Sequence, residues 1–150
     1  MLLGLIVLLG LAIRLCGLGE RTMTHIETYV PGIHLPAGLS DPSPRLTVKA
    51  TLLDMIYRFE PHPPGYYLFM LGWTRVFGAG IEWLRLPSVI FGTACILLVF
   101  FLGMQEKNQI AGLLAALLLA LNGHQVFWSQ LAKNYVFSEF IGLAATIFLL

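Results

Sequence analysis

Four apolar segments, separated by more polar stretches, dominate the hydrophobic pattern of this chain. They cover residues 1–18, 86–104, 110–128 and 135–150. A helix needs about 20 apolar residues to cross the hydrocarbon core of a bilayer, and each segment comes close to that length. Within lipid the backbone must satisfy its own hydrogen bonds, and a single helix does so. The pattern therefore predicts an all-α, multi-pass transmembrane protein.

A fifth apolar segment, residues 65–77, is shorter and rich in aromatic residues. Tyr66, Phe69, Trp73 and Phe77 recur at helical spacing. Aromatic side chains prefer the headgroup level of a membrane. We therefore expect a helix that lies at the membrane interface, with a tilted spanning helix as the alternative.

The stretch 19–64 differs in kind from the apolar segments. It holds seven of the eight prolines and three of the four histidines. Within it, residues 47–59 carry apolar positions at helical spacing, which predicts one short amphipathic helix. A connection of this length is usually functional or a linker, and we expect a long first loop here.

Composition supports a membrane protein. Hydrophobic residues make up 57% of the chain and charged residues 11%, whereas soluble domains carry about 25% charged residues. The net charge of +1 provides no basic stripe for nucleic acid. Cys16 and Cys95 lie in apolar runs and are interpreted as inert thiols. Because the chain stops inside an apolar run, we expect it to be the N-terminal portion of a longer protein, or a truncated copy of one.

Several short motifs, taken in order, resemble those of one enzyme family. The N-terminal segment ends with Arg14-Leu15 and Gly17-Leu18. The later motifs are residues 62–68 (HPPGYYL), 84–88 (LRLPS), 112–116 (GLLAA) and 129–135 (SQLAKNY). Together they resemble the family 39 glycosyltransferases, relatives of the dolichyl-phosphate-mannose protein mannosyltransferases with the membrane-embedded GT-C fold.

The resemblance implies an enzyme that transfers a hexose, mannose-like, from a polyprenyl-phosphate sugar to an acceptor protein, lipid or glycan. The reaction would take place on the extracytoplasmic face of the cell (plasma or inner) membrane, with inversion at the anomeric carbon. Residues 19–64 would then lie outside. An interfacial helix over 65–77 fits this topology, because it brings residues 129–135 to the same side as the long loop.

The same resemblance points to candidate catalytic residues. The family's Asp-Glu pair after the first helix aligns with Ile26-Glu27, so Ile26 stands where the family has its Asp. Glu27 is then the candidate base, with His25 beside it and Glu20 as the next choice. In the last motif Leu131 replaces the family's Glu and Lys133 its Arg.

Sugar transfer from a lipid phosphate needs a base for the acceptor hydroxyl and positive charge for the departing phosphate. Each candidate also has an ordinary role, as a solvated carboxylate, a loop-packing histidine or an anchor at the headgroups. We expect Glu27 and His25 to be catalytic, and His62, Arg85, Lys133 and Tyr135 to bind substrate.

Whether a cofactor is needed is left open by the sequence. His25 and Glu27, with His34 or His62, could bind a divalent metal ion, although the characteristic close spacing of metal ligands is absent.

Two further polar positions in apolar segments are of interest. Arg14 is expected at the membrane edge, where its side chain could snorkel or face protein. His124 lies near the outer end of a predicted span and could line the site.

Two other classes of function fit parts of the sequence. The changes at Ile26 and Lys133 are also typical of a non-catalytic relative that binds lipid-linked sugar or scaffolds a partner. A transporter or channel subunit would more often carry charge or helix breaks at mid-membrane, whereas 86–104 and 110–128 contain no charged residue.

Overall fold

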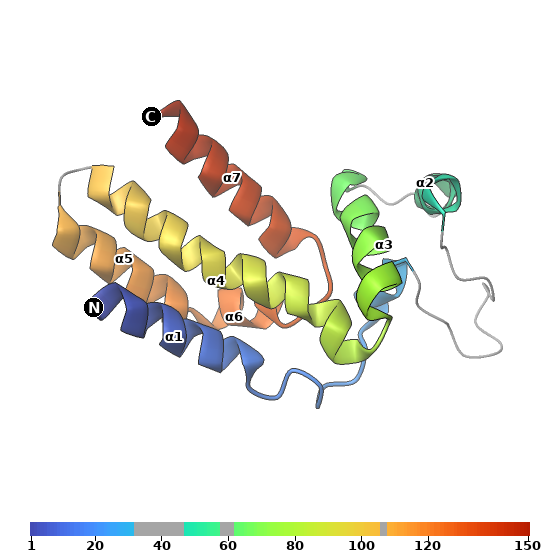
Figure 1. Ribbon diagram of the computed structural model, residues 1–150, viewed down its shortest axis with the longest axis horizontal. Coiled ribbons are helices and arrows are strands. Elements are labelled where there is room, and N and C mark those ends of the chain that lie inside the picture. Colours follow the sequence, from blue (N-terminus) through green and yellow to red (C-terminus); the bar gives the residue numbers. More distant parts are fainter. Residues whose placement is uncertain (32–46, 58–61, 106–107) are drawn as a thin grey trace. The chain divides into compact units, whose positions relative to one another are not determined.

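A computed structural model describes residues 1–31, 47–57, 62–105 and 108–150 of the chain. All regular secondary structure in these ranges is helical, which confirms the all-α prediction for them (Figure 1). The elements are α1 (Leu2–Leu15), the 3₁₀ helix η1 (His25–Tyr29), α2 (Val48–Tyr57), α3 (Gly65–Phe77), α4 (Ile81–Gln105), α5 (Gln109–Leu121), α6 (Gly123–Ser129) and α7 (Tyr135–Leu149).

The described residues form two compact units. The first unit consists of Met1–Glu20 and Arg85–Leu150, and so contains α1, most of α4, and α5 to α7. The second unit, Arg21–Leu84, contains η1, α2 and α3.

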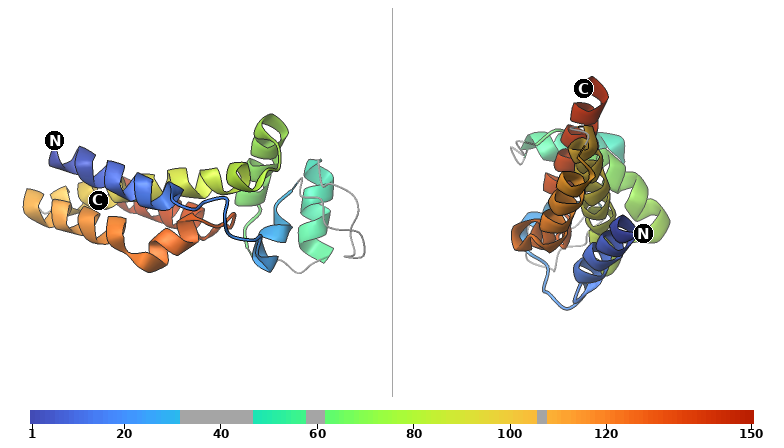
Figure 2. Two further views of the ribbon diagram at one scale, coloured as in Figure 1. Left: turned by 90° about the horizontal axis from the view of Figure 1, so that it is seen from below. Right: turned by 90° about the vertical axis from the view of Figure 1, so that its left-hand side faces the viewer.

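The core of the first unit lies between α1, α4 and α5. Ile6 on α1, Ile96 and Phe100 on α4, and Ala116 and Ala120 on α5 form one buried apolar cluster. Helices α1 and α5 run side by side, as Figures 1 and 2 both show. Small residues on α5 let the helix backbones approach closely, as is common where helices pack in lipid.

Helices α4 and α5 make their closest approach through a pair of glycines. A β-carbon added to Gly103 would lie only 2.6 Å from the Cα atom of Gly112. A β-carbon on Gly112 would lie 2.8 Å from the carbonyl oxygen of Phe100. No larger residue fits at either position without moving a backbone, so these glycines set the distance between the two helices.

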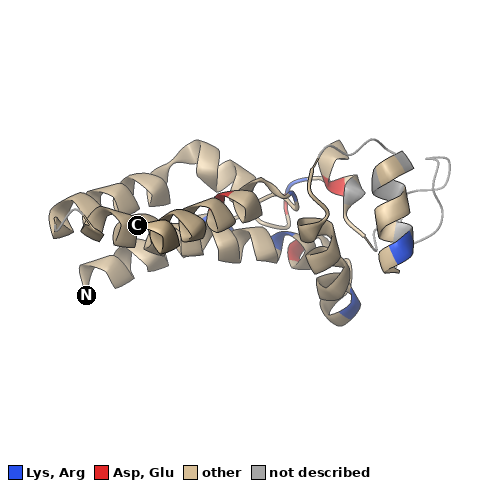
Figure 3. Ribbon diagram, turned by 90° about the horizontal axis from the view of Figure 1, so that it is seen from above, with Lys and Arg blue, Asp and Glu red and all other residues tan. Residues whose placement is uncertain are grey.

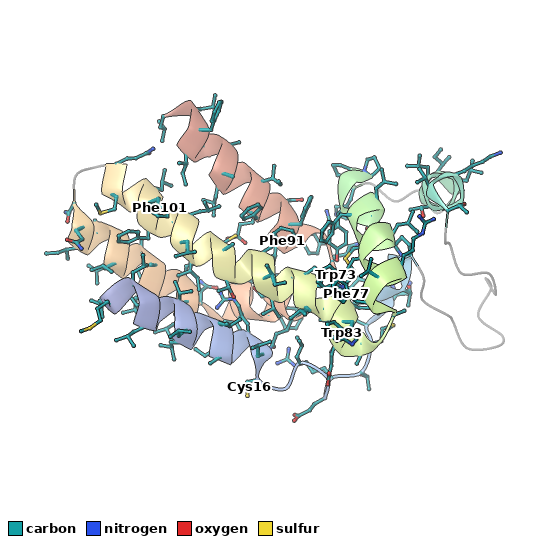
Figure 4. The ribbon with its side chains drawn as sticks, in the orientation of Figure 1. Cys16, Trp73, Phe77, Trp83, Phe91 and Phe101 are labelled. Atoms are coloured by element: carbon teal, nitrogen blue, oxygen red, sulfur yellow. The ribbon has the colours of Figure 1, made fainter. Side chains whose placement is uncertain are left out.

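Helix α7 packs on α4 through aromatic rings. The ring centroid of Phe91 lies 5.1 Å from that of Phe137 and 5.2 Å from that of Phe140. Phe91 and Phe101 are labelled on α4 in Figure 4. Apart from the ends, the helices of this unit carry almost no charged residues in the part of the chain that is described (Figure 3).

Helix lengths bear on the predicted spans. Helix α4 is long and apolar enough to cross a membrane, and α5 with α6 passes the same test if the bent pair counts as one span. Helices α1 and α7 are apolar but shorter, and α1 ends at Leu15 rather than near Leu18. The number of crossings therefore stays a prediction.

The helix expected over 110–128 is not continuous. It is broken between Leu121 and Gly123, with a bend of 61° between α5 and α6. Asn122 sits at the break with extended backbone angles, and its side chain accepts a hydrogen bond from the backbone N–H of Gln125 at 2.9 Å. Asparagine competes in this way for backbone donors and therefore ends one helix and caps the next.

Helix α4 begins at Ile81, five residues before the expected start at 86, and so includes Pro87. Proline has no N–H, so the carbonyl of Trp83, four residues earlier, lacks its usual helical donor. The indole Nε1 of Trp73 on α3 donates to that carbonyl at 2.8 Å. A side chain thus replaces the missing backbone donor.

The second unit contains the two helices that were expected in it. The helix predicted within 47–59 is α2. The helix predicted over 65–77 is α3, and its bounds are those predicted. Its position relative to a membrane stays a prediction. Within the aromatic stripe, the ring of Trp73 stacks on Phe69 and contacts the tilted ring of Phe77, with centroid distances of 6.2 and 4.2 Å. Trp73 and Phe77 are labelled in Figure 4. Phe77 in turn stacks on Trp83 at 5.4 Å.

Candidate functional site

The two expected catalytic residues lie in η1. Glu27 is 1% exposed, and its Oε2 atom accepts hydrogen bonds from the backbone N–H and the hydroxyl of Thr24, at 2.9 and 3.0 Å. This is a capping box, in which a carboxylate at the third helical position closes the start of the helix. His25, the first residue of η1, has an exposed side chain. Glu27 therefore has a local structural role, whatever else it does.

The other expected residues are divided between the units. His62 is half-buried just before α3 in the second unit. Arg85, Lys133 and Tyr135 belong to the first unit. Because the six residues fall into two units, their assembly into one site stays a prediction.

Arg85 and Lys133 are both buried rather than exposed at a surface. Arg85 is fully buried, and its Nη1 donates to the backbone carbonyl of Leu18 at 2.7 Å. This bond holds the start of α4 to the segment that follows α1. Lys133 is 4% exposed and lies in the short connection between α6 and α7. Simple headgroup anchoring would leave both side chains exposed, so that alternative is weakened.

An extensive polar array is centred on Arg14. Arg14 is fully buried, and its guanidinium donates to the carbonyls of Leu119 and Ala120, each at 3.3 Å. These carbonyls belong to the last turn of α5, where carbonyl groups run out of regular helical donors. The Leu119 carbonyl also accepts from the backbone N–H of Asn122 at 3.3 Å. A third bond goes to the carbonyl of Gly10 at 2.9 Å. A cation at a helix C-terminus is also favoured by the helix dipole.

The same guanidinium reaches α6. Its Nε donates to the hydroxyl of Ser129 at 3.2 Å, and its Nη2 donates to Oε1 of Gln125. The Ser129 hydroxyl also contacts Oε1 of Gln125 at 3.0 Å. Gln130 completes the array, since its Nε2 lies within hydrogen-bond distance of the carbonyls of Arg14 and Cys16, at 3.1 and 2.9 Å. The end of α1 is therefore fixed to the bent α5–α6 pair.

A cavity of about 340 Å³ opens beside this array, between α6 and α7. It is lined by His124, Gln125, Trp128, Tyr135, Val136 and Glu139. Gln125 connects the two features: its Oε1 faces Arg14, and its Nε2 donates to Oε2 of Glu139 at 3.4 Å. The amide is thus oriented by its partners, since Arg14 can only donate and a carboxylate accepts. Buried polar groups therefore extend from the helix core to the cavity wall.

Three residues with aromatic rings, His124, Trp128 and Tyr135, form another part of the wall. The indole Nε1 of Trp128 donates to Nε2 of His124 at 2.9 Å. Because indole can only donate, the histidine nitrogen must accept, and a neutral ring then carries its proton on Nδ1. The ring of Tyr135 lies edge-on to Trp128, with 4.5 Å between the centroids.

Of the six expected residues, Tyr135 is the one that lines this cavity. His124, noted in the sequence for its place near the end of a span, lines it too. A pocket with apolar and aromatic walls and a few convergent polar groups is the usual form of a small-molecule site. The arrangement can accept and donate hydrogen bonds through Glu139, Gln125 and His124 while packing a ligand on the rings.

Sequence reasoning did not identify Arg14 and Glu139 as site residues. Glu139 is the one charged residue of the segment 135–150. A lone carboxylate in an apolar helix is itself a signal of function, because charge is costly in lipid. Arg14 carries the same signal, but its partners on α5 and α6 are more than 100 residues away along the chain. No local pattern could have named them.

Metal binding finds no support in the described ranges. No group of three or more His, Cys, Asp or Glu side chains there could hold a metal ion. His34, one of the candidate ligands, lies outside those ranges.

Comparisons with known proteins give one family. The family model described as dolichyl-phosphate-mannose-protein mannosyltransferase matches residues 61–150, which is more than half of the chain. No match was found among curated proteins or among solved structures. The matched region contains His62, Arg85 and the whole lining of the α6–α7 cavity. The chain therefore belongs to the dolichyl-phosphate-mannose-protein mannosyltransferase family of glycosyltransferases.

Proposed function

We propose that this chain belongs to an enzyme that transfers a hexose, mannose-like, from a polyprenyl-phosphate sugar to an acceptor protein, lipid or glycan. The transfer takes place at the extracytoplasmic face of the cell membrane. The observation that carries this proposal is the family match over residues 61–150. Buried polar groups placed among apolar helices support it, because such groups are retained in lipid where they serve a site.

The reaction is a single displacement. The acceptor hydroxyl oxygen attacks the anomeric carbon, and a new C–O bond forms as the bond from that carbon to the phosphate oxygen breaks. A base takes the hydroxyl proton, and the carrier leaves as polyprenyl phosphate. Attack opposite to the leaving group inverts the anomeric configuration.

In this proposal Glu27 is the base and His25 assists it. Lys133 and Arg85 supply the positive charge that stabilises the departing phosphate, with His62 and Tyr135 binding substrate. Burial of Arg85 and Lys133 supports such a role, because a cation shielded from water acts more strongly on a nearby anion.

Sugar transfer with and without the proposed base tests the enzyme class. Membranes that contain the full-length gene product are supplied with radiolabelled polyprenyl-phosphate mannose, glucose or galactose. For wild type we expect transfer from one donor, and for Glu27→Gln a loss of about 100-fold or more, as is typical of a general base. Glu82→Gln, which removes an exposed carboxylate of α4, is the matched control.

Two outcomes would revise the proposal. Transfer that persists in Glu27→Gln at equal expression keeps the enzyme class and moves the base to Glu20 or His25. No transfer from any donor in wild type contradicts the enzyme class.

A second function is favoured by the setting of Glu27. Its carboxylate closes the capping box of η1, and Ile26 stands where the family has its Asp. Both observations fit a non-catalytic relative that binds lipid-linked sugar or scaffolds a partner. Binding of polyprenyl-phosphate sugar without release of the sugar would favour this function over transfer.

A further inference from the structure

The α6–α7 cavity has the size of a site for one small ring. Its volume of about 340 Å³ lies near the lower end of the range for ligand pockets, about 300–1,000 Å³. All six lining residues come from α6 and the first turns of α7, so the site is built within one unit of the molecule. A long polyprenyl chain would not fit inside it, whereas a single sugar ring would.

The charges around the cavity favour a neutral ligand. Glu139 contributes a carboxylate, and neither Lys nor Arg is among the lining residues in the part of the chain described. A phosphate placed here would be repelled by the like charge of the Glu139 carboxylate. The cavity lining therefore suits an uncharged, hydrogen-bonding group better than a phosphate.

The polar groups suit hydroxyls in particular. The Glu139 carboxylate accepts hydrogen bonds, and charge-assisted bonds of this kind are the strongest available to a hydroxyl. His124 offers a donor at Nδ1, because its Nε2 is taken by the Trp128 indole. Trp128 and Tyr135 add aromatic surfaces against which the C–H faces of a pyranose can pack.

The donors and acceptors are also held in place. Gln125 is fixed on one side by Arg14 and Ser129 and on the other donates to Glu139 at 3.4 Å. Binding then requires little reordering of the cavity wall, and preorganisation of this kind raises affinity.

We propose that the cavity between α6 and α7 is a binding site for a neutral hexopyranose ring, in which Glu139 accepts hydrogen bonds from sugar hydroxyls and Trp128 and Tyr135 pack against the ring. The choice of a hexose as the ligand rests on the proposed function. The ring is either the sugar of the lipid-linked donor or a sugar already attached to the acceptor.

Direct binding to the full-length protein in lipid nanodiscs tests this proposal. The probes are polyprenyl-phosphate mannose, glucose and galactose, the bare polyprenyl phosphate, and the corresponding methyl hexosides. The variant Glu139→Gln keeps the shape of the side chain and removes its charge. Glu82→Gln again serves as the matched control.

If the donor sugar occupies the cavity, Glu139→Gln weakens binding of the lipid-linked sugar by about 10-fold or more and leaves the affinity for bare polyprenyl phosphate unchanged. If an acceptor sugar occupies the cavity, Glu139→Gln instead weakens binding of the methyl hexoside by the same factor. Unchanged affinity for bare polyprenyl phosphate also shows that the variant is folded.

Trp128→Leu provides an independent check, because it removes the ring and leaves the carboxylate. We expect Trp128→Leu to weaken binding of the same sugar-bearing probe whose binding Glu139→Gln weakens. The proposal would be overturned if Glu139→Gln and Trp128→Leu both bound the sugar-bearing probes as tightly as the control Glu82→Gln does. That result would leave the proposed function intact. Wild-type protein that binds none of the sugar-bearing probes would overturn both.

Discussion

At the scale of single residues, Arg14 connects three helices through one planar group. Its donors reach carbonyls of α1 and α5 and side chains of α6. Arginine suits this task better than lysine, because its guanidinium presents five N–H donors in a rigid plane. The tight fit extends to Gly92, where an added β-carbon would lie 3.2 Å from Nε of Arg14.

We therefore predict that Arg14→Lys destabilises the protein although it keeps the charge. Interhelical hydrogen bonds in membrane proteins contribute about 0.6 kcal/mol each on average, and a lysine can retain only part of the set. The expected loss is about 2 kcal/mol in free energy of unfolding, measured by denaturation in mixed micelles. The control is Arg75→Lys at an exposed position of α3. Equal stability of the two variants would contradict the structural role of Arg14.

At the scale of elements, the start of α4 depends on a substitute donor. Pro87 leaves the Trp83 carbonyl without a backbone partner, and the Trp73 indole donates to it instead. This explains how the helix can begin at Ile81, ahead of its proline.

We predict that Trp73→Phe costs about 0.5–1 kcal/mol of stability, because it removes one hydrogen bond and keeps an aromatic ring in the stack. The substitution Pro87→Ala restores a backbone N–H that can donate to Trp83. In that background Trp73→Phe should cost measurably less, and a double-mutant cycle of thermal stabilities gives the coupling. Strictly additive costs would show that the two donors do not serve the same carbonyl.

Helix positions could be predicted from the sequence better than helix breaks. The aromatic spacing of residues 65–77 predicts α3 with its observed bounds, because periodicity and composition are local properties. The break at Asn122 could not be predicted in the same way, since an asparagine in an apolar run can face a neighbour or cap a new helix. The hydrogen-bond donors around the side chain decide whether it faces a neighbouring helix or caps a new one. Those donors depend on tertiary structure.

At the scale of the whole molecule, the candidate site was only partly predictable for the same reason. The family motifs led to Arg85, Lys133 and Tyr135, and Tyr135 does line the cavity. Glu139 is a candidate only because α6 and α7 together enclose a cavity that it lines. Motifs identify residues one segment at a time, whereas a cavity is a property of several segments packed together.

The remaining question at this scale is the predicted arrangement across the membrane, which depends on whether α3 crosses it. If α3 lies at the interface, Thr22 is on the side where α4 begins, and the crossing of α4 puts Asn108 on the opposite side. If α3 crosses instead, Thr22 and Asn108 lie on the same side. This difference depends only on the number of crossings and not on the absolute orientation.

We predict that Thr22 and Asn108 lie on opposite sides of the membrane. In a background with Cys16→Ala and Cys95→Ala, a single cysteine at Thr22 should react with an impermeant maleimide added to intact cells. A single cysteine at Asn108 should react only after the membrane is opened. Labelling of both positions from outside would make α3 a spanning helix and would separate residues 129–135 from the first loop. It would thereby contradict a shared extracytoplasmic site for Glu27 and Lys133, because a base and a phosphate-binding cation on opposite faces cannot act on one substrate.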